Sequence, residues 1–233
     1  FYPTVVLMFA VLVVTGMMLF VVPVFLGFYP EDVELPLITQ MVIGFSNSLR
    51  AYWYLYCLGL IVVLFAARTY LAQEQGKILL DKIKFRAPVF GSLVQKTVVA
   101  RFARTLATLL AGGIAILQAL ETAGPASGNS LIAKAVAEAA EWIQQGQNLA
   151  RPLQESGLFP PMVTLMISVG EETGDLPGLL NRVADFYEAE VAAMSKGLTS
   201  LIEPLMLIGV GGIVAVIVIA LYLPMFTVIS QFQ

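Results

Sequence analysis

Three stretches of the chain are apolar over a length that can cross a bilayer, and this feature limits its fold more than any other. They cover residues 4–26, 51–71 and 198–229, and a spanning helix needs about 20 residues at about 1.5 Å of rise each. The first stretch holds no charged residue, the second only Arg68 and the third only Glu203. Because a bilayer offers backbone groups no water to bond, the stretches predict three transmembrane helices.

The composition argues against several classes of protein. The chain is 58% hydrophobic and 12% charged, whereas a soluble domain is about 25% charged. It contains no histidine, which excludes Ser-His-Asp and Cys-His sites and zinc sites that use histidine. A net charge of −3 without a long basic run argues against direct nucleic-acid binding, and no phosphate-binding or dinucleotide motif is present. We therefore expect a non-enzymatic protein without a metal or cofactor.

Charges beside the apolar stretches predict the topology. Residues 27–50 carry three acids and one cation, while residues 68–88 carry five cations. Positive flanks remain on the cytoplasmic side. We expect transmembrane helices over 1–26, 51–72 and 197–229, a periplasmic loop over 27–50, a cytoplasmic domain over 73–196 and a periplasmic C-terminus. The N-terminus, Phe1-Tyr2-Pro3, has no initiator methionine, so we expect earlier sequence to precede it.

Apolar residues in the cytoplasmic segment recur every three or four positions, which is typical of helices packed on one side. One such stripe holds Val94, Val98, Phe102, Leu106 and Leu109/Leu110, and it ends at Gly112-Gly113. A second stripe holds Ile132, Val136, Ala139/Ala140 and Ile143. The fold class is all-α: three transmembrane helices and a bundle of about six helices with short Gly/Pro connections. We expect the last bundle helix to continue into the third span and to bend at Pro204.

The stretch VGEETGDLPGLL, residues 169–180, joins the last two bundle helices. Gly170–Gly174 is expected to form the turn, and Asp175 to cap the next helix. Glu171 and Glu172 are adjacent, so on a helix their side chains do not face each other as an acid and a base would. Two readings remain open for these carboxylates: solvated or ion-paired turn residues, or, with Asp175, a docking site for a partner.

Charge is divided unevenly between the first and last parts of the segment. Residues 77–104 hold seven cations and Asp81 alone, whereas residues 170–196 hold six acids and two cations. The two parts either pair within one subunit or meet another copy or another protein. Arg101 and Arg104 belong to this set. They are more typical of partners within the domain than of ligand binders, and they stay candidates for docking.

Glu203 is the one acid within a predicted span. An ionisable residue inside a membrane suggests function, here a polar contact with another helix or subunit, although its place near the span's start favours an interfacial anchor. Gly209, Gly211 and Gly212, with Pro204, are candidates for close contact with another helix or subunit. A transporter or channel subunit that uses Glu203 as a polar pathway residue is the alternative function.

Three stretches carry a resemblance to a known family. GSLVQKTVVARFARTLATLLAGGIAILQALETA (91–123), GLFPPMVTLMISVGEETGDLPGLLNRVADFYEAEV (157–191) and EPLMLIGVGGIVAVIVIALYLPMF (203–226) resemble the inner-membrane platform proteins of type IV pilus and type II secretion machines, the PilC/GspF-like family. Members have two cytoplasmic modules in tandem. The chain resembles the second module with its flanking spans, so the first module would precede Phe1.

The resemblance implies a multi-pass protein of the bacterial cytoplasmic membrane that acts through contacts. It implies coupling of a cytoplasmic hexameric ATPase to the extraction and polymerisation of pilin or pseudopilin subunits. It also implies other inner-membrane assembly proteins as partners and a homo-oligomer, either dimer or tetramer. Whether the machine builds a pilus, secretes proteins or takes up DNA stays open.

Overall fold

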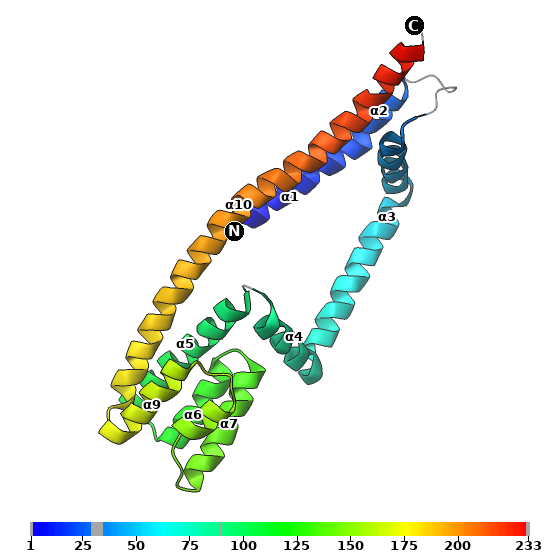
Figure 1. The fold of residues 1–233 in the computed structure, drawn as a ribbon. Coiled ribbons are helices and arrows are strands. Elements are labelled where there is room, and N and C mark those ends of the chain that lie inside the picture. Colours follow the sequence, from blue (N-terminus) through cyan, green and yellow to red (C-terminus); the bar gives the residue numbers. More distant parts are fainter. Residues whose placement is uncertain (1, 29–34, 89, 232–233) are drawn as a thin grey trace. The chain divides into compact units, whose positions relative to one another are not determined.

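The structure is a computed structural model that describes residues 2–28, 35–88 and 90–231, and these residues form helices and no strands (Figure 1). The chain divides into two compact units. A span unit comprises Phe1–Ala66 and Leu198–Gln233, and a bundle unit comprises Ala67–Gly197. Three helical stretches are long and apolar enough to cross a membrane: Thr4–Leu26, Leu37–Ala72 and Leu176–Pro224. The all-α prediction and the three predicted spanning helices are confirmed.

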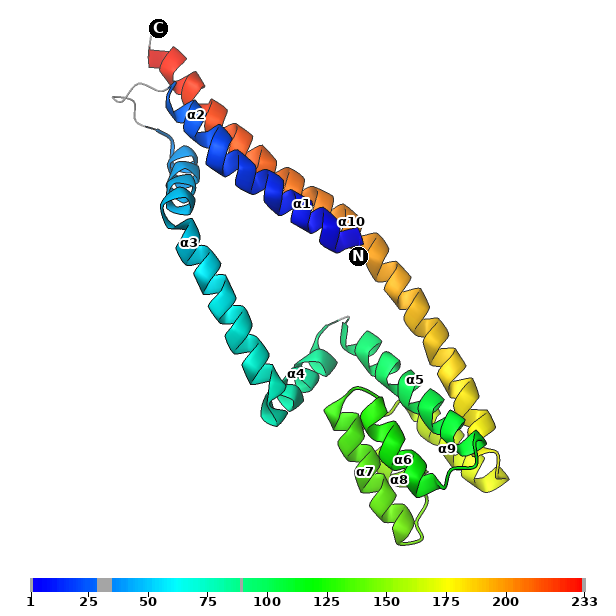
Figure 2. The same cartoon turned by 180° about the vertical axis from the view of Figure 1, so that it is seen from behind.

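The first span consists of three consecutive helical segments. These are α1 (Tyr2–Gly16), the π-helical segment η1 (Met17–Val21) and α2 (Val22–Leu26). The wider π turn ends two residues before Pro23, whose missing N–H and bulky ring disturb the α-helical hydrogen bonding of the preceding turn. These segments lie alongside the C-terminal part of α10 in both opposite views (Figures 1 and 2).

The second span, α3 (Leu37–Ala72), begins earlier than the sequence predicts. Residues 37–50, which we assigned to a periplasmic loop, are helical and have no helix-breaking proline. A kink follows at Tyr52, where φ is −121° and ψ is 18°. The acids that favoured the periplasmic side, Glu31, Asp32 and Glu34, lie outside the described residues. The helix boundary therefore differs from the prediction, while the side of the membrane on which it lies stays a prediction.

The early part of α3 packs into the core of the span unit. Two polar side chains in this helix are fully buried, Thr39 and Ser46. The Thr39 hydroxyl donates to the Ala220 carbonyl at 2.6 Å, and the Ser46 hydroxyl donates to the Met18 carbonyl at 2.5 Å. Thr39, Val42 and Ser46 lie three to seven positions apart and so share one helix face. The apolar residues of this core are Met18, Val22, Val42, Ile217, Ala220 and Leu221.

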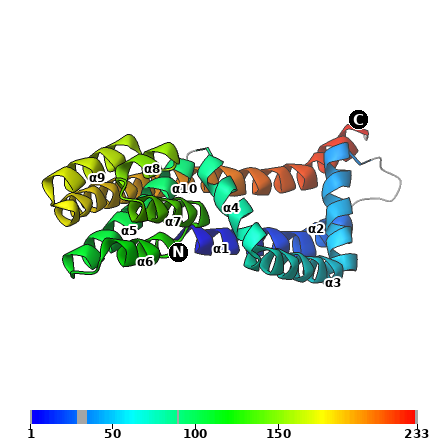
Figure 3. The ribbon, with the colours of Figure 1, turned by 90° about the horizontal axis from the view of Figure 1, so that it is seen from below.

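The bundle unit contains the helices around a larger core (Figure 3). They are α4 (Glu74–Arg86), α5 (Phe90–Ala111), α6 (Ile116–Ala126), α7 (Ser130–Gln144), α8 (Ala150–Glu155), α9 (Pro161–Thr173) and the first part of α10 (Leu176–Gln231). Helices α5 to α10 correspond to the six predicted from the sequence. Helix α4 is an addition, since residues 74–86 have mixed charge and no clear apolar stripe.

Both predicted apolar stripes point into this core. Phe102 and Leu106 of α5 and Ile132 of α7 are fully buried, with Leu180 of α10. Phe102 meets Phe159 edge to face with ring centres 5.4 Å apart, an arrangement that aromatic pairs prefer. Burial of about 1.5–3 kcal/mol per large apolar side chain makes this core the main source of stability in the unit.

Helix α10 belongs to both units, as the sequence predicts. Leu176–Gly197 is part of the bundle unit and Leu198–Gln231 part of the span unit. Pro204 lies inside the helix, which continues past it. The loss of one backbone hydrogen bond at Pro204 is therefore tolerated without ending the helix.

Candidate interaction site on the bundle

The turn expected at Gly170–Gly174 is shorter than predicted, because α9 continues to Thr173 and only Gly174 and Asp175 separate it from α10. Most residues of this GEETGD turn, residues 170–175, hold the fold. Gly170 is buried, and a Cβ at this position would lie 2.9 Å from the Leu176 Cα. This distance is shorter than side chains tolerate, so only glycine allows the start of α10 to approach α9. Gly174 ends α9 with φ of +77°, a left-handed conformation that glycine adopts without a steric cost.

The two acids at the ends of the turn are structural caps. One Glu171 oxygen accepts from the Leu149 N–H at 2.6 Å, and the other accepts from the Ala150 N–H at 3.2 Å. Glu171 thus satisfies backbone donors at the start of α8 that have no helical partner. Asp175 accepts from the Gly178 N–H at 3.0 Å and caps α10, as predicted. Both carboxylates are fixed by contacts within the chain.

Glu172 lies at the C-terminal end of α9 and is exposed. Its neighbours Glu171 and Asp175 accept backbone hydrogen bonds within the chain. The carboxylate of Glu172 is instead open to solvent, at a helix end where negative charge is disfavoured by the helix dipole. Glu172 and Asp175 are both exposed, but Asp175 is also engaged as the cap of α10.

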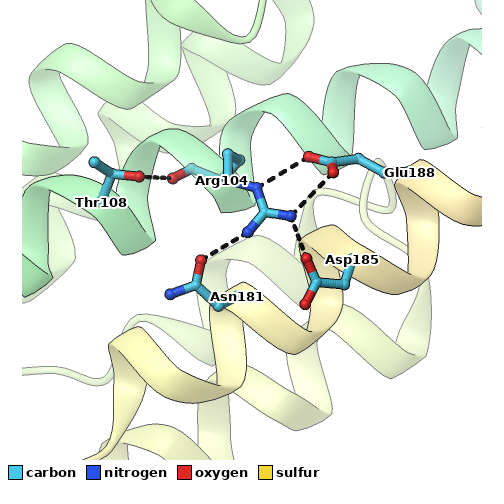
Figure 4. Close-up of polar contacts among 5 residues, drawn as sticks. All are labelled: Arg104, Thr108, Asn181, Asp185 and Glu188. Atoms are coloured by element: carbon cyan, nitrogen blue, oxygen red, sulfur yellow. Dashed lines mark hydrogen bonds and ion pairs between the residues drawn. The ribbon is translucent and has the colours of Figure 1, made fainter.

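Arg104 of α5 binds three side chains of α10 (Figure 4). Its Nε donates to Glu188 Oε1 and its Nη2 to Glu188 Oε2, both at 3.0 Å. Nη2 also donates to Asp185 Oδ1. The other terminal nitrogen donates to the Asn181 Oδ1 at 2.9 Å. The three acceptors lie on successive turns of α10, so one planar guanidinium bridges two helices.

The surroundings keep Arg104 charged. Hydrogen bonding to Glu188, and then to Asp185, raises the pKa of the Arg104 guanidinium above its ordinary value. A second bridge between the same helices joins Lys96 Nζ to Glu190 Oε1 at 3.1 Å. The basic first part and the acidic last part of the bundle thus pair within one chain, which was one of the two predicted alternatives.

Arg101 lies one turn before Arg104 and is exposed. One of its terminal nitrogens lies 2.8 Å from where a Cβ on Gly128 would be, so the guanidinium covers the end of α6. Arg101, Arg104 and Glu188 line an open groove of about 340 Å³ between α5 and α10.

The predicted helix end at Gly112-Gly113 also forms, with Gly113 at φ of +80°.

The family follows from comparison with known proteins. A family model described as "Type II secretion system (T2SS), protein F" matches residues 102–224, which is more than half of the 233 residues. The chain belongs to this protein F family. The matched region begins in α5, includes Arg104 and the GEETGD turn, and ends in the span portion of α10.

Relatives of this protein F family member come from both pilus and secretion machines. It is 44% identical to the type IV pilus assembly protein PilC of Thermus thermophilus over 231 residues, 98% of the chain and 57% of that protein. It is 37% identical to PilC of Myxococcus xanthus, over 100% of the chain and 56% of the relative. Identity to the type II secretion system protein F of Pseudomonas aeruginosa is also 37%, over 96% of the chain and 55% of that protein. The chain spans about half the length of these relatives.

The predicted intramembrane candidates of this family member are exposed residues of α10. Glu203 and Pro204 are exposed within the chain. A Cβ on Gly209, Gly211 or Gly212 would meet nothing within 4 Å. Packing within the described part of the chain therefore makes no close contact at these three glycines.

Within the bundle unit, sequence reasoning missed several polar contacts that hold helices together. Asn181 completes the Arg104 site, and nothing in its spacing marks it as a ligand of an arginine. Asp81 of α4 accepts from both the N–H and the hydroxyl of Ser130, at 2.8 and 2.7 Å. Asp81 is the sole acid among the seven cations of residues 77–104, and this isolation could have indicated that it has a specific partner. Within residues 2–28, 35–88 and 90–231, no group of three His, Cys, Asp or Glu side chains is placed to hold a metal.

Proposed function

We propose that the chain is part of a non-enzymatic platform in the bacterial cytoplasmic membrane. In this proposal the bundle unit is cytoplasmic, receives a hexameric assembly ATPase, and passes its movement to pilin or pseudopilin subunits held in the membrane. The names of the relatives, pilus assembly protein and secretion system protein F, support such a role. Pilus and secretion relatives overlap in identity, 37% for both PilC of Myxococcus xanthus and protein F of Pseudomonas aeruginosa, so the proposal covers either machine.

The observation that carries the proposal is that α10 belongs to both units. An ATPase bound to the bundle would act on a helix that is also a membrane span, with Leu176–Gly197 in one unit and Leu198–Gln231 in the other. The Arg104 and Lys96 bridges tie α5 to the bundle part of α10. A displacement of the bundle would therefore be shared by α10, since several charged contacts and a common core must move together.

The proposed ATPase contact is the exposed carboxylate of Glu172. The other candidates in the turn, Glu171 and Asp175, are engaged as helix caps. Arg104 is engaged by α10, while Arg101 is exposed and stays a second docking candidate. An exposed carboxylate attracts a basic surface and mainly sets the orientation and rate of docking.

Replacing Glu172 tests this contact in a cell that depends on the protein. The protein that carries this chain, with Glu172→Ala, replaces the cell's own copy. We expect normal membrane levels, a clear loss of filament assembly, and less ATPase recovered when the protein is purified from membranes. Charge reversal, Glu172→Lys, should have the larger effect.

The matched control is Glu141→Ala, which removes another exposed glutamate from α7 of the same unit. It should leave assembly and ATPase recovery unchanged. Assembly at the normal level in the Glu172→Lys cell would remove the docking proposal. Loss of assembly in both variants would show instead that the bundle tolerates no loss of surface charge.

A homo-oligomer in the membrane is the second part of the proposal. Gly209, Gly211 and Gly212 leave a smooth surface on α10, and Glu203 and Pro204 lie on the same span. Small residues allow close approach of a helix from a second copy. Gly211→Leu should lower the oligomeric state measured by light scattering in detergent, while an unchanged mass would contradict this interface.

A further inference from the structure

Helix α4 presents an outward face that mixes large apolar side chains with cations. Ile78, Leu79 and Ile83 are 43%, 47% and 60% exposed. Lys82 and Arg86 are exposed as well, and at about 100° per residue they lie between these apolar side chains on the same face. A helix with this composition has a surface that water alone does not suit.

Two side chains beside the outward face of α4 are held by the bundle. Asp81 is nearly buried and accepts two hydrogen bonds from Ser130 at the start of α7. Phe85 packs against the main core. The rotation of α4 about its axis is therefore fixed, and the acid at Asp81 is turned away from the outward face. That face presents cations without a neighbouring carboxylate from Asp81.

The position of α4 in the chain connects this face to the bilayer. The spanning helix α3 ends at Ala72 and α4 begins at Glu74. Two residues of chain reach at most about 7 Å, so the start of α4 lies within about 7 Å of the end of α3. Arg68 is the first charged residue after the apolar run of α3, four residues before its end and so about 6 Å along the helix. A bilayer's headgroup layers add about 10–15 Å to its hydrocarbon core, roughly half of that on each side. Helix α4 therefore follows directly where the chain leaves the lipid.

We propose that α4 is an interfacial helix that lies on the membrane and binds anionic phospholipid. Lys82 and Arg86 contact headgroup phosphates, while Ile78, Leu79 and Ile83 enter the boundary with the acyl chains. Leu79, Lys82, Ile83 and Arg86, with Ala87 and Pro88, line an open groove of about 550 Å³ that suits a lipid headgroup. Exposed apolar groups favour lipid over an acidic protein surface, which would satisfy the cations alone.

The expected strength follows from the number of cations. Each lysine or arginine close to an anionic surface favours the attached state about fivefold, so loss of both weakens attachment about 25-fold. The inference needs α3 to span the membrane and does not depend on an ATPase partner. Its failure would leave the proposed platform role untouched.

A lipid-quenching experiment tests the proposal on the whole chain in nanodiscs. In a Cys57→Ser background, Ile83→Cys carries a fluorophore, and some lipids carry a nitroxide near the headgroup. We expect strong quenching in bilayers that contain phosphatidylglycerol and weaker quenching in pure phosphatidylcholine. Lys82→Gln with Arg86→Gln should abolish the difference, and Lys82→Arg with Arg86→Lys should retain it.

Two controls make the result specific. A fluorophore at Lys134→Cys, an exposed site on α7, should be quenched much less than one at Ile83. Lys134→Gln with Arg151→Gln removes the same charge elsewhere on the bundle and should leave quenching at Ile83 unchanged. Circular dichroism reports whether each variant keeps its helical content. Equal quenching of the fluorophores at positions 83 and 134 would overturn the proposal. A fluorophore at position 83 that lipid does not quench, and that is shielded from water only when a soluble acidic protein is added, would overturn it too.

Discussion

The hydroxyl of Thr39 donates a 2.6 Å hydrogen bond to the backbone carbonyl of Ala220. In an unbroken helix this carbonyl would accept from the N–H of residue 224, which is a proline and has none. Thr39 on α3 therefore supplies the donor that Pro224 on α10 cannot. In hydrocarbon an unsatisfied carbonyl is costly, and hydroxyl side chains of neighbouring helices are a usual remedy for proline in spans.

Ser46 has the same role at the other proline of the span unit. Within η1 the Val22 N–H bonds to the Met17 carbonyl, so the π-helical partner of the Met18 carbonyl would be Pro23. Pro23 has no N–H, and the Ser46 hydroxyl donates to Met18 at 2.5 Å instead. Two hydroxyls on one face of α3 thus compensate for two prolines on two other segments.

Thr39→Val should destabilise the span unit by about 1–2 kcal/mol, since the shape is kept and the Ala220 carbonyl loses its donor. Thr39→Ser should cost less. Pro224→Ala restores an N–H, so Thr39→Val should cost less in that background than alone. Unfolding in mixed micelles, followed by Trp53 fluorescence in a Trp142→Phe background, measures each term. Equal costs in both backgrounds would show that the hydroxyl does not replace the proline's missing donor.

Arg104→Ala and Glu188→Ala should be coupled in a double-mutant cycle. The side chains of Arg104, Asp185 and Glu188 are partly exposed. We therefore expect a coupling free energy of about 0.5–1 kcal/mol between Arg104 and Glu188 in the stability of the bundle unit. High salt should reduce it. Unfolding followed by Trp142 in a Trp53→Phe background reports on this unit. Arg101→Ala, one turn away, is the control and should show no coupling with Glu188→Ala.

Glu171 and Glu172 should differ in their effect on stability despite their adjacency. Glu171→Ala leaves the Leu149 and Ala150 N–H groups without their acceptor and should cost about 1–2 kcal/mol. Glu172→Ala should change the free energy of unfolding by less than about 0.5 kcal/mol. The same Trp142 measurement separates them. Similar losses from both replacements would contradict the assignment of Glu171 as the cap.

Gly170→Ala should destabilise the bundle by about 1–3 kcal/mol, because its methyl group would lie 2.9 Å from the Leu176 Cα. Gly197→Ala is the matched control within α10, where a Cβ meets nothing within 4 Å. At that site alanine should be neutral or stabilise by up to about 1 kcal/mol. A destabilisation of the same size at both sites would mean that close packing at Gly170 is not the cause.

The sequence predicts the helices well where apolar spacing or hydrophobic length dominates. The stripe from Val98 to Leu106, the three spans and the Asp175 cap all follow from rules that act within one or two turns. The continuation of α10 from bundle to span also follows, since nothing stronger than Gly197 interrupts it.

Contacts between distant segments could not be predicted in this way. The Thr39 hydroxyl meets a carbonyl 181 positions away, and Arg104 selects Asn181, Asp185 and Glu188 from many polar residues on α10. Charge patterning indicated that the two segments attract each other and gave no partner for any one residue. The start of α3 was missed because the apolar run begins only near Ala51, while residues 37–50 include polar side chains such as Gln40, Asn47 and Arg50.

Photo-crosslinking from position 172 in living cells tests the proposed platform role most directly. A crosslinking amino acid replaces Glu172 in the protein that carries this chain, and a second version places it at Glu141. The account predicts that position 172 captures the assembly ATPase and position 141 does not. Capture from neither position, or equal capture from both, in cells that still assemble filaments would contradict docking at this turn.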